Sequence, residues 1–323
     1  MMKQVLGISF GRKMRNSDVM VKAALLECKA AGFEIEFLRA DDLNIHNCTG
    51  CIACSIGLMS GQAKGECAHK DDMPILDEAV LRSDAVILGC PVYETSPTGR
   101  FKTICDRIGP SHDLSFRKVA IEEGLAAGKS METLPDSRCL KPRVGALMSV
   151  GGAMTKNWLA FSIPIMYQFT FPLAIDVIDH FECHGAMAYE HIVGNDEAMA
   201  RCAQIGRNIA GALNAESEAD RTRWRGDLQG VCPMCHCNLL TIPENGDATK
   251  IECPVCGIAG VLTIKDGIIQ AHFSDEEMAH SRLSYAGLLE HSTEIKTRAA
   301  PSGSIPDLKE RLEKYRWLNF KES

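Results

Sequence analysis

The chain lacks an excess of basic residues, and this absence bears on its partners. Its 323 residues include 35 Lys and Arg against 42 Asp and Glu, so the formal net charge is −7. No basic run and no interleaving of aromatic with basic residues interrupts that balance. Because binding to nucleic acid or to an anionic membrane depends on clustered positive charge, we expect neither as a partner.

The first residues do not predict a secretory signal. The apolar run in MMKQVLGISFGRK is too short for one, because Gly11, Arg12 and Lys13 end it. We therefore expect a cytoplasmic, reducing environment. In that environment the 15 cysteines are better interpreted as thiols or metal ligands than as disulfides.

Charge is absent from one long segment, residues 158–175 (WLAFSIPIMYQFTFPLAI), which approaches membrane-spanning length. Pro164 and Pro172 interrupt the segment, and Gln168 is one of several polar residues in it. The pattern therefore disfavours a membrane span. It predicts a buried helix that ends before Pro172 and runs into a buried strand. A surface for self-association is an alternative.

What the sequence does contain is a regular alternation of strand and helix patterns. The expected strands are residues 4–10, 33–40, 85–93, 144–152 and 173–182. The expected helices include residues 17–32, with Ser17 as N-cap, and residues 73–84, 98–109 and 195–216. This order predicts an α/β fold with a doubly wound, five-stranded parallel sheet. Residues 110–142 look like an insertion with a short helix near 117–127.

The pattern changes after residue 216, at the charged stretch ESEADRTRWRGDLQG. We expect a first domain at residues 1–216 and a smaller module at residues 217–323 that ends in a helical tail. Within the module, ENGD is expected at the tip of a hairpin-like stretch, followed by a short strand pair.

Four cysteines of this module form two C-x-x-C pairs, Cys232 with Cys235 and Cys253 with Cys256, separated by 17 residues. This spacing is typical of a zinc ribbon, in which four thiolates enclose one Zn²⁺. The stretch CPVCG also resembles a rubredoxin knuckle, so iron is the alternative, and four unliganded thiols are another. A closed set of four ligands leaves no position for substrate, so we expect a role in folding or docking.

A second group, Cys48, Cys51, Cys54 and Cys67, has the spacing C-x2-C-x2-C-x12-C. Three close thiolates and one remote thiolate suit an iron–sulfur cluster better than zinc, which favours two pairs. The alternative is a cysteine-rich loop that holds no cluster and packs near a cofactor.

Several stretches resemble, in order, the NADPH-dependent FMN reductase family and, more narrowly, its iron–sulfur flavoprotein branch. They are GISFGRKMRNSD, CTGCIACSIGLMSGQAKGECAHKDDM, DAVILGCPVYETSPTGRFKTICDR and VGALMSVGG. The resemblance covers about residues 3–215 and implies a flavodoxin-like fold that binds FMN. In the branch it also implies a 4Fe-4S cluster held by the cysteine motif. The chain departs from the family at Phe10, where proline is usual, and in the long gap before Cys67.

In such a sheet, ligands bind at the carboxyl ends of the strands. We expect the FMN phosphate at the start of the first helix, held by Ser9, Arg12, Asn16 and Ser17. Simple helix capping is the alternative for Ser17. We expect the flavin ring beside Pro91, Val92, Tyr93 and Glu94, and closed on its other side by Ser149, Gly151 and Gly152. Tyr93 would stack on the ring or, alternatively, pack in the core.

These features predict an FMN-dependent oxidoreductase that takes electrons from NAD(P)H or a ferredoxin-like protein. The acceptor would be a quinone-like or flavin-like molecule or a protein. No catalytic side chain is expected, because the flavin N5 itself accepts the hydride. The alternative is a non-enzymatic, flavodoxin-like electron carrier that docks through its ribbon, and a redox-sensing regulator is a weaker one. The resemblance also implies a homo-oligomer.

Overall fold

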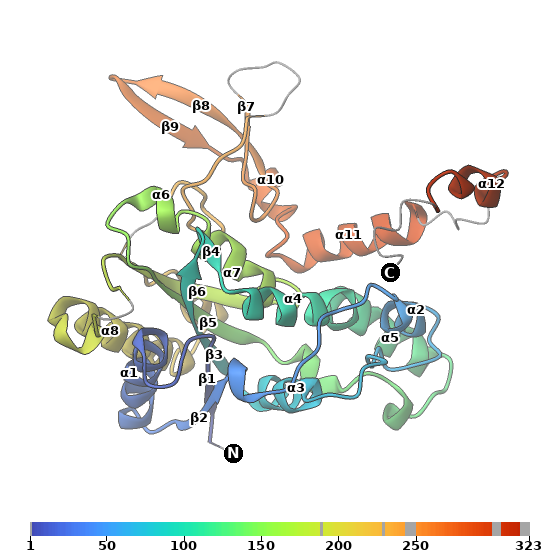
Figure 1. Ribbon diagram of the computed structural model, residues 1–323, viewed down its shortest axis with the longest axis horizontal. Helices are drawn as coiled ribbons and strands as arrows, with labels where there is room; N and C mark the ends of the chain where they lie inside the picture. Colours follow the sequence, from blue (N-terminus) through green and yellow to red (C-terminus); the bar gives the residue numbers. More distant parts are fainter. Residues whose placement is uncertain (1, 188–189, 228–229, 243–249, 299–304, 317–323) are drawn as a thin grey trace.

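The computed structural model describes residues 2–187, 190–227, 230–242, 250–298 and 305–316. Within these residues, five parallel strands form a central sheet in the order β2-β1-β3-β5-β6 (Figure 1). The strands are β1 (Gln4–Ser9), β2 (Glu34–Arg39), β3 (Ala85–Tyr93), β5 (Arg143–Val150) and β6 (Ile175–Cys183). A two-residue strand, β4 (Ser96–Pro97), pairs antiparallel with the end of β3. The predicted parallel sheet is confirmed.

Helices cover both faces of this sheet, because each strand places successive side chains on opposite sides. Val5 and Ile87 pack in the core beneath α1 (Asn16–Ala30) and α8 (Asp196–Leu213). Leu6 and Leu88 pack in the opposite core. The helices on that side are α3 (Met73–Arg82), α4 (Gly99–His112) and α7 (Ser162–Thr170). The strands are therefore apolar on both faces, as their continuous runs predicted.

The start of α1 corrects one expectation. The helix begins at Asn16 with Arg15 as its N-cap residue, so Ser17 lies inside the helix and does not cap it. The reason is Asp18, whose carboxylate accepts hydrogen bonds from the Met14 N–H at 2.9 Å and the Ser9 hydroxyl at 2.5 Å. This buried carboxylate organises the turn that the cap was expected to organise.

The uncharged segment forms two helices, the short α6 (Lys156–Leu159) and α7, which ends at Thr170 before Pro172 as predicted. The following strand begins at Ile175, two residues later than expected, because Ala174 turns the chain with φ of 46°. No helix among the described residues combines the length and apolar character needed to cross a membrane.

The insertion is more regular than its sequence suggested. It contains α5 (Leu114–Ala126), thirteen residues long, which Asp113 caps by accepting a hydrogen bond from the Ser115 N–H. In the cysteine-rich stretch, α2 (Ala53–Met59) was not expected. A kink at Gly109 interrupts α4 where the predicted helix ended.

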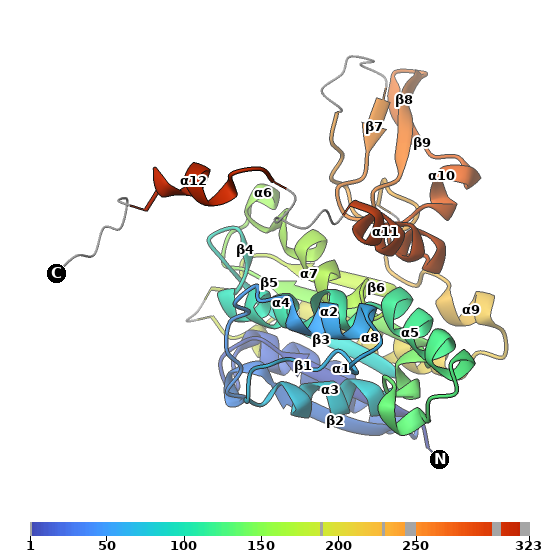
Figure 2. The same ribbon diagram turned by 90° about the vertical axis from the view of Figure 1, so that its right-hand side faces the viewer.

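The C-terminal module stands on the α7 side of the sheet (Figure 2). It contains an antiparallel sheet of β7 (Lys250–Glu252), β8 (Ala259–Lys265) and β9 (Ile268–His272). Its helices are α9 (Glu218–Thr222), α10 (Asp275–Ala279), α11 (Tyr285–Arg298) and α12 (Leu308–Glu313). The ENGD stretch lies outside the described residues.

The module is packed against the rest of the chain by specific contacts. The hydroxyl of Tyr167 on α7 donates a hydrogen bond to the carbonyl of Cys235 at 2.7 Å. The Ser115 hydroxyl on α5 lies 3.2 Å from the carbonyl oxygen of Leu288 on α11, beside its shorter hydrogen bond to Asp113. The boundary near residue 216 stays a prediction.

Candidate functional site

A pocket of about 320 Å³ opens at the carboxyl edge of the sheet. Eight of the predicted cofactor residues line it: Arg12, Asn16, Ser17, Pro91, Val92, Tyr93, Gly151 and Gly152. Five residues that were not predicted complete the lining: Gly11, Arg15, Val150, Ala186 and Met187. Loops that follow β1, β3, β5 and β6 therefore converge on one cavity, which is where an open parallel sheet binds its ligand.

The loop after β1 is shaped by buried groups below the pocket. Ser9 is fully buried, and its hydroxyl accepts a hydrogen bond from the Gly11 N–H at 3.2 Å while donating to Asp18. Ser9 therefore positions the loop and is not among the residues that line the pocket. A Cβ on Gly11 would lie 2.8 Å from the Cβ of Ser17, so the tight turn requires glycine.

The same loop presents positive charge to the pocket. Arg12 and Arg15 are exposed, and neither guanidinium forms a hydrogen bond or ion pair with the residues that the structure describes. The first N–H groups of α1 lack intrahelical partners, as at any helix N-terminus. Free guanidinium donors beside a helix N-terminus are a suitable environment for a phosphate group.

Asn16 lines the pocket, and its side chain also has a structural role. Its amide donates to the carbonyls of Ala186 and Glu190 at 3.3 and 3.1 Å, and its oxygen accepts from the Ile192 N–H at 3.0 Å. The side chain thus fixes the segment after β6 against α1. Its contribution to binding a phosphate would be its backbone N–H.

The loop after β3 forms the opposite wall. Tyr93 is 53% exposed, which excludes the alternative that it is a core residue. Val92 is buried beneath it, and Glu94 and Thr95 turn the chain with φ of 47° and 67°. The Glu94 side chain is exposed and is not among the lining residues. An exposed aromatic ring at the mouth of a pocket can stack on a flat ligand.

The loop after β5 closes the pocket on its third side. A Cβ on Gly151 would lie 2.8 Å from the Cδ1 of Leu159, so glycine lets the backbone approach α6 closely. Ser149 is fully buried, because the alternation along β5 directs it to the α7 side. It is hydrogen-bonded at 2.9 Å to the hydroxyl of Ser162, which donates to Glu182 at 3.0 Å. Ser149 lies below the pocket, outside its lining.

The ribbon cysteines form a preassembled metal-ligand group. The thiol sulfurs of Cys232, Cys235, Cys253 and Cys256 all lie within 4.8 Å of one another and all four residues are buried. Cys237 is buried too, but its thiol lies by the carbonyl of Cys235 at 3.6 Å and is outside the group. Four converging thiols fit Zn²⁺, and the same donor set fits iron.

The first cysteine group is arranged more openly. Cys48 and Cys51 are exposed, and Cys54 and Cys67 are half-buried. Cys48 and Cys51 precede α2, Cys54 lies in its first turn and Cys67 follows it in the chain. No three of these four sulfurs lie within 4.8 Å of one another, whereas all four ribbon sulfurs do. The iron–sulfur cluster stays a prediction.

Comparison with known proteins identifies the fold. Residues 4–157 match the NADPH-dependent FMN reductase family. Flavone synthase cfoJ of Aspergillus candidus is 30% identical over 316 residues, which cover 95% of this chain and 94% of that protein. The chain belongs to the NADPH-dependent FMN reductase family. It is therefore a flavodoxin-like oxidoreductase, and FMN is the cofactor that family membership supports.

Two further relatives extend the comparison. A solved structure described as flavone reductase superposes with a TM-score of 0.79 at 28% identity and covers 99% of both chains. An iron–sulfur flavoprotein of Archaeoglobus fulgidus is 42% identical over 109 residues, which are 34% of this chain and 46% of that protein. The family likeness thus extends over the ribbon module in the first relative, whereas the likeness to the second covers about half of that protein.

The pocket fits FMN on the observations of this structure. Its lining combines a helix N-terminus and two guanidinium groups that have no partner among the described residues with an exposed tyrosine and close-packed glycine backbone. Sequence reasoning missed Arg15, Ala186 and Met187. The last two follow the fifth strand, so the rule that located the other loops could also have located them.

Proposed function

We propose that this protein is an FMN-dependent reductase that passes electrons from a reduced nicotinamide or protein donor to a flat, conjugated acceptor. A quinone, a flavin or a flavone-like enone has the required chemistry. The observation that carries the proposal is the pocket at the sheet edge, whose mouth is formed by the exposed Tyr93 and by Met187. The relatives whose names refer to flavones support the flavone-like class.

In this proposal the bound FMN supplies hydride transfer, and the chain supplies binding and orientation. Arg12 and Arg15, with the N–H groups of α1, would hold the phosphate. Tyr93 and the backbone of Val92 and Gly151 would hold the ring and exclude water from one face. These assignments explain why the pocket needs no acid–base pair of side chains.

The experiment that tests this function uses full-length protein purified without oxygen. We expect FMN to bind, NADH or NADPH to reduce it, and steady turnover with menadione or flavone as acceptor. The double variant Arg12→Gln and Arg15→Gln should bind FMN about tenfold or more weakly, because charge-assisted contacts to phosphate are lost. Lys13→Gln is the matched control, since Lys13 lies in the same loop and does not line the pocket. Protein that binds no FMN would contradict the proposal.

A second candidate function is electron carriage between proteins, without turnover of a small molecule. The exposure of Cys48 and Cys51 favours it, because a cluster held there would be accessible to a protein partner. Flavin reduction by a ferredoxin-like donor, with no acceptor turnover by NADH or NADPH, would support the carrier over the enzyme.

A further inference from the structure

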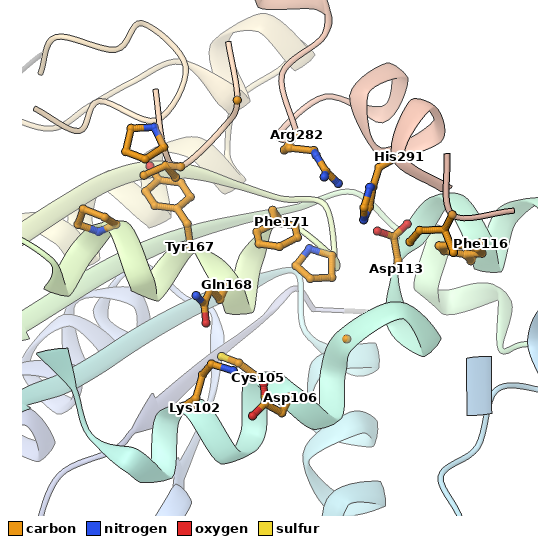
Figure 3. Close-up of a pocket in the computed structure, with 17 residues that line it drawn as sticks. Lys102, Cys105, Asp106, Asp113, Phe116, Tyr167, Gln168, Phe171, Arg282 and His291 are labelled. Carbon is orange, nitrogen blue, oxygen red and sulfur yellow. Dashed lines mark hydrogen bonds and ion pairs between the residues drawn. The ribbon is translucent and has the colours of Figure 1, made fainter. Parts of the chain in front are cut away.

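A second and larger cavity lies away from the flavin pocket. It has a volume of about 540 Å³ and shares no lining residue with that pocket. Figure 3 shows it between α4 and α7 on one side and the C-terminal module on the other. Its volume is in the range that holds small organic ligands.

One part of its wall is apolar and flat. Tyr167 and Phe171 come from α7 and the turn that follows it, and Pro172 continues the same surface. Phe116, 4% exposed, and Ile295 line the side formed by α5 and α11. Aromatic and proline surfaces of this kind suit an aromatic ring.

Two polar side chains that could bind a ligand stand opposite this wall. Arg282 is half-buried and extends into the cavity (Figure 3), and its side chain forms no hydrogen bond or ion pair with any residue that the structure describes. His291 lies beside it, and its Nδ1 atom is buried without a hydrogen-bond partner in the described part of the chain. The nearest acid to that nitrogen is Glu294, at 3.7 Å.

The other charged groups of the cavity are already satisfied. Asp113 accepts hydrogen bonds from the N–H and the hydroxyl of Ser115, at 2.9 and 2.5 Å. Lys102 and Asp106 form an ion pair with each other at the edge of the cavity. Asp113 also faces His291 (Figure 3), and the two groups interact electrostatically. Arg282 is the lining cation that has no acidic partner among the described residues, and a negatively charged ligand would complement it.

We propose that this cavity binds an aromatic carboxylate at a site separate from the flavin. Its ring would pack against Phe171 and Pro172, and its carboxylate would accept hydrogen bonds from Arg282 and His291. Because both the sheet domain and the C-terminal module line the cavity, the bound ligand would join the two. The proposal goes beyond the reductase function and does not depend on it.

Calorimetric titration of the FMN-loaded, full-length protein tests this site, with 2-naphthoate as the probe and the neutral 2-naphthamide as its control. We expect naphthoate to bind with a Kd below about 1 mM and the amide to bind at least about tenfold more weakly. Arg282→Gln should reduce naphthoate affinity about tenfold or more, and Arg282→Lys should reduce it less. Arg311→Gln is the matched control, because Arg311 is exposed and does not line the cavity.

A second variant separates binding from folding. Ile295→Trp adds volume at the cavity wall and should abolish naphthoate binding while FMN affinity, followed by flavin fluorescence, is unchanged. The proposal is overturned by absence of naphthoate binding, by equal affinity for the amide, or by unchanged affinity in Arg282→Gln. It is also overturned if naphthoate displaces FMN, which would place the probe in the flavin pocket.

Discussion

The two cysteine groups use the same side chain in opposite surroundings. The four ribbon thiols are buried and lie within 4.8 Å of one another. They belong to a hydrophobic cluster that also contains Tyr167 of α7 and sheet residues such as Leu6 and Leu88. The thiols of the first group lie on an exposed or half-buried loop around α2. A metal in the first case would be enclosed by protein, and a cluster in the second case would be open to solvent.

This difference indicates that the two cysteine groups contribute differently to the stability of the fold. The ribbon thiols are part of the packing that fixes the C-terminal module on α7, so their ligand contributes to folding. The cysteine loop is held by other contacts. The Arg107 guanidinium donates to the carbonyl of His46 at 2.9 Å and pairs with the buried carboxylate of Asp71. That loop should keep its position when a thiol is removed.

The largest expected effect comes from breaking the ribbon set. Cys253→Ser should lose the bound metal and destabilise the protein by about 3 kcal/mol or more, because metal affinity at a structural site is folding free energy. Metal content by mass spectrometry and unfolding in urea measure both changes. Cys237→Ser is the control, since Cys237 is equally buried and outside the group. Full metal content in Cys253→Ser would show that a different set holds the ion.

A smaller effect on stability is expected from Asp176 on strand β6. Its pH dependence is opposite to that of a metal site built from thiolates. Burial raises the pKa of Asp176 to about 6. The folded protein therefore favours the neutral carboxyl, and the associated stability is present at low pH and is lost as pH rises from about 4 to about 6. Asp176→Asn should stabilise the protein by about 1 to 2 kcal/mol at pH 7.5 and by much less at pH 4.

Urea unfolding of the two proteins at both pH values checks this prediction. Loss of metal from thiolates destabilises a ribbon as pH falls, whereas Asp176 destabilises the sheet as pH rises. Both proteins contain the same metal site, so its effect cancels when the free energy of unfolding of the variant is compared with that of the wild type at the same pH. An equal gain at pH 4 and pH 7.5 would show that the charge of Asp176 is not the cause.

The contact between ribbon and sheet domain can be weakened without touching a thiol. Tyr167→Phe removes the hydroxyl that donates to the carbonyl of Cys235 and leaves that buried carbonyl with only the weaker thiol donor of Cys237. We expect a loss of about 1 kcal/mol in the free energy of unfolding, with the metal retained. Tyr285→Phe is the matched control, because the Tyr285 hydroxyl has no hydrogen-bond partner among the described residues. Equal losses in both variants would mean that this hydrogen bond adds nothing to docking.

Most of the fold and part of the candidate site could be predicted from the sequence. Apolar runs and helical spacing located the five strands because each element carries its own periodicity. The ribbon thiols were predicted by spacing alone, since each pair is local and two pairs are needed for one ion. Pro91, Tyr93 and Gly151 line the pocket because parallel strands end at one edge.

What could not be predicted depends on contacts between distant residues. Ser17 was expected to cap α1, but the buried carboxylate of Asp18 organises the turn instead. Ser149 was expected beside the ring, and the face to which β5 directs it became clear only from the packing on α7. Arg282 and Phe171 line the same cavity, although they are far apart in the sequence, and no local sequence pattern predicts this.

The smallest effect on stability is expected from the exposed cysteine group. Cys48→Ser should shift the unfolding midpoint by less than about 2 °C, because Cys48 is exposed and no core side chain is changed. If the loop holds a 4Fe-4S cluster, the same variant should lose iron, acid-labile sulfide and the broad visible absorption that flavin does not account for. Ser55→Ala, in the neighbouring helix α2, should keep all three.

The iron content and stability of Cys48→Ser show whether the two cysteine groups have different roles. Unchanged iron content in Cys48→Ser would remove this residue from the ligand set, and absence of iron from anaerobic wild-type protein would reject the cluster altogether. A destabilisation as large as that of Cys253→Ser would show instead that the exposed group is structural. A stable variant that has lost its iron and kept its FMN would establish one enclosed, structural metal and one open, redox-active cluster in a single chain.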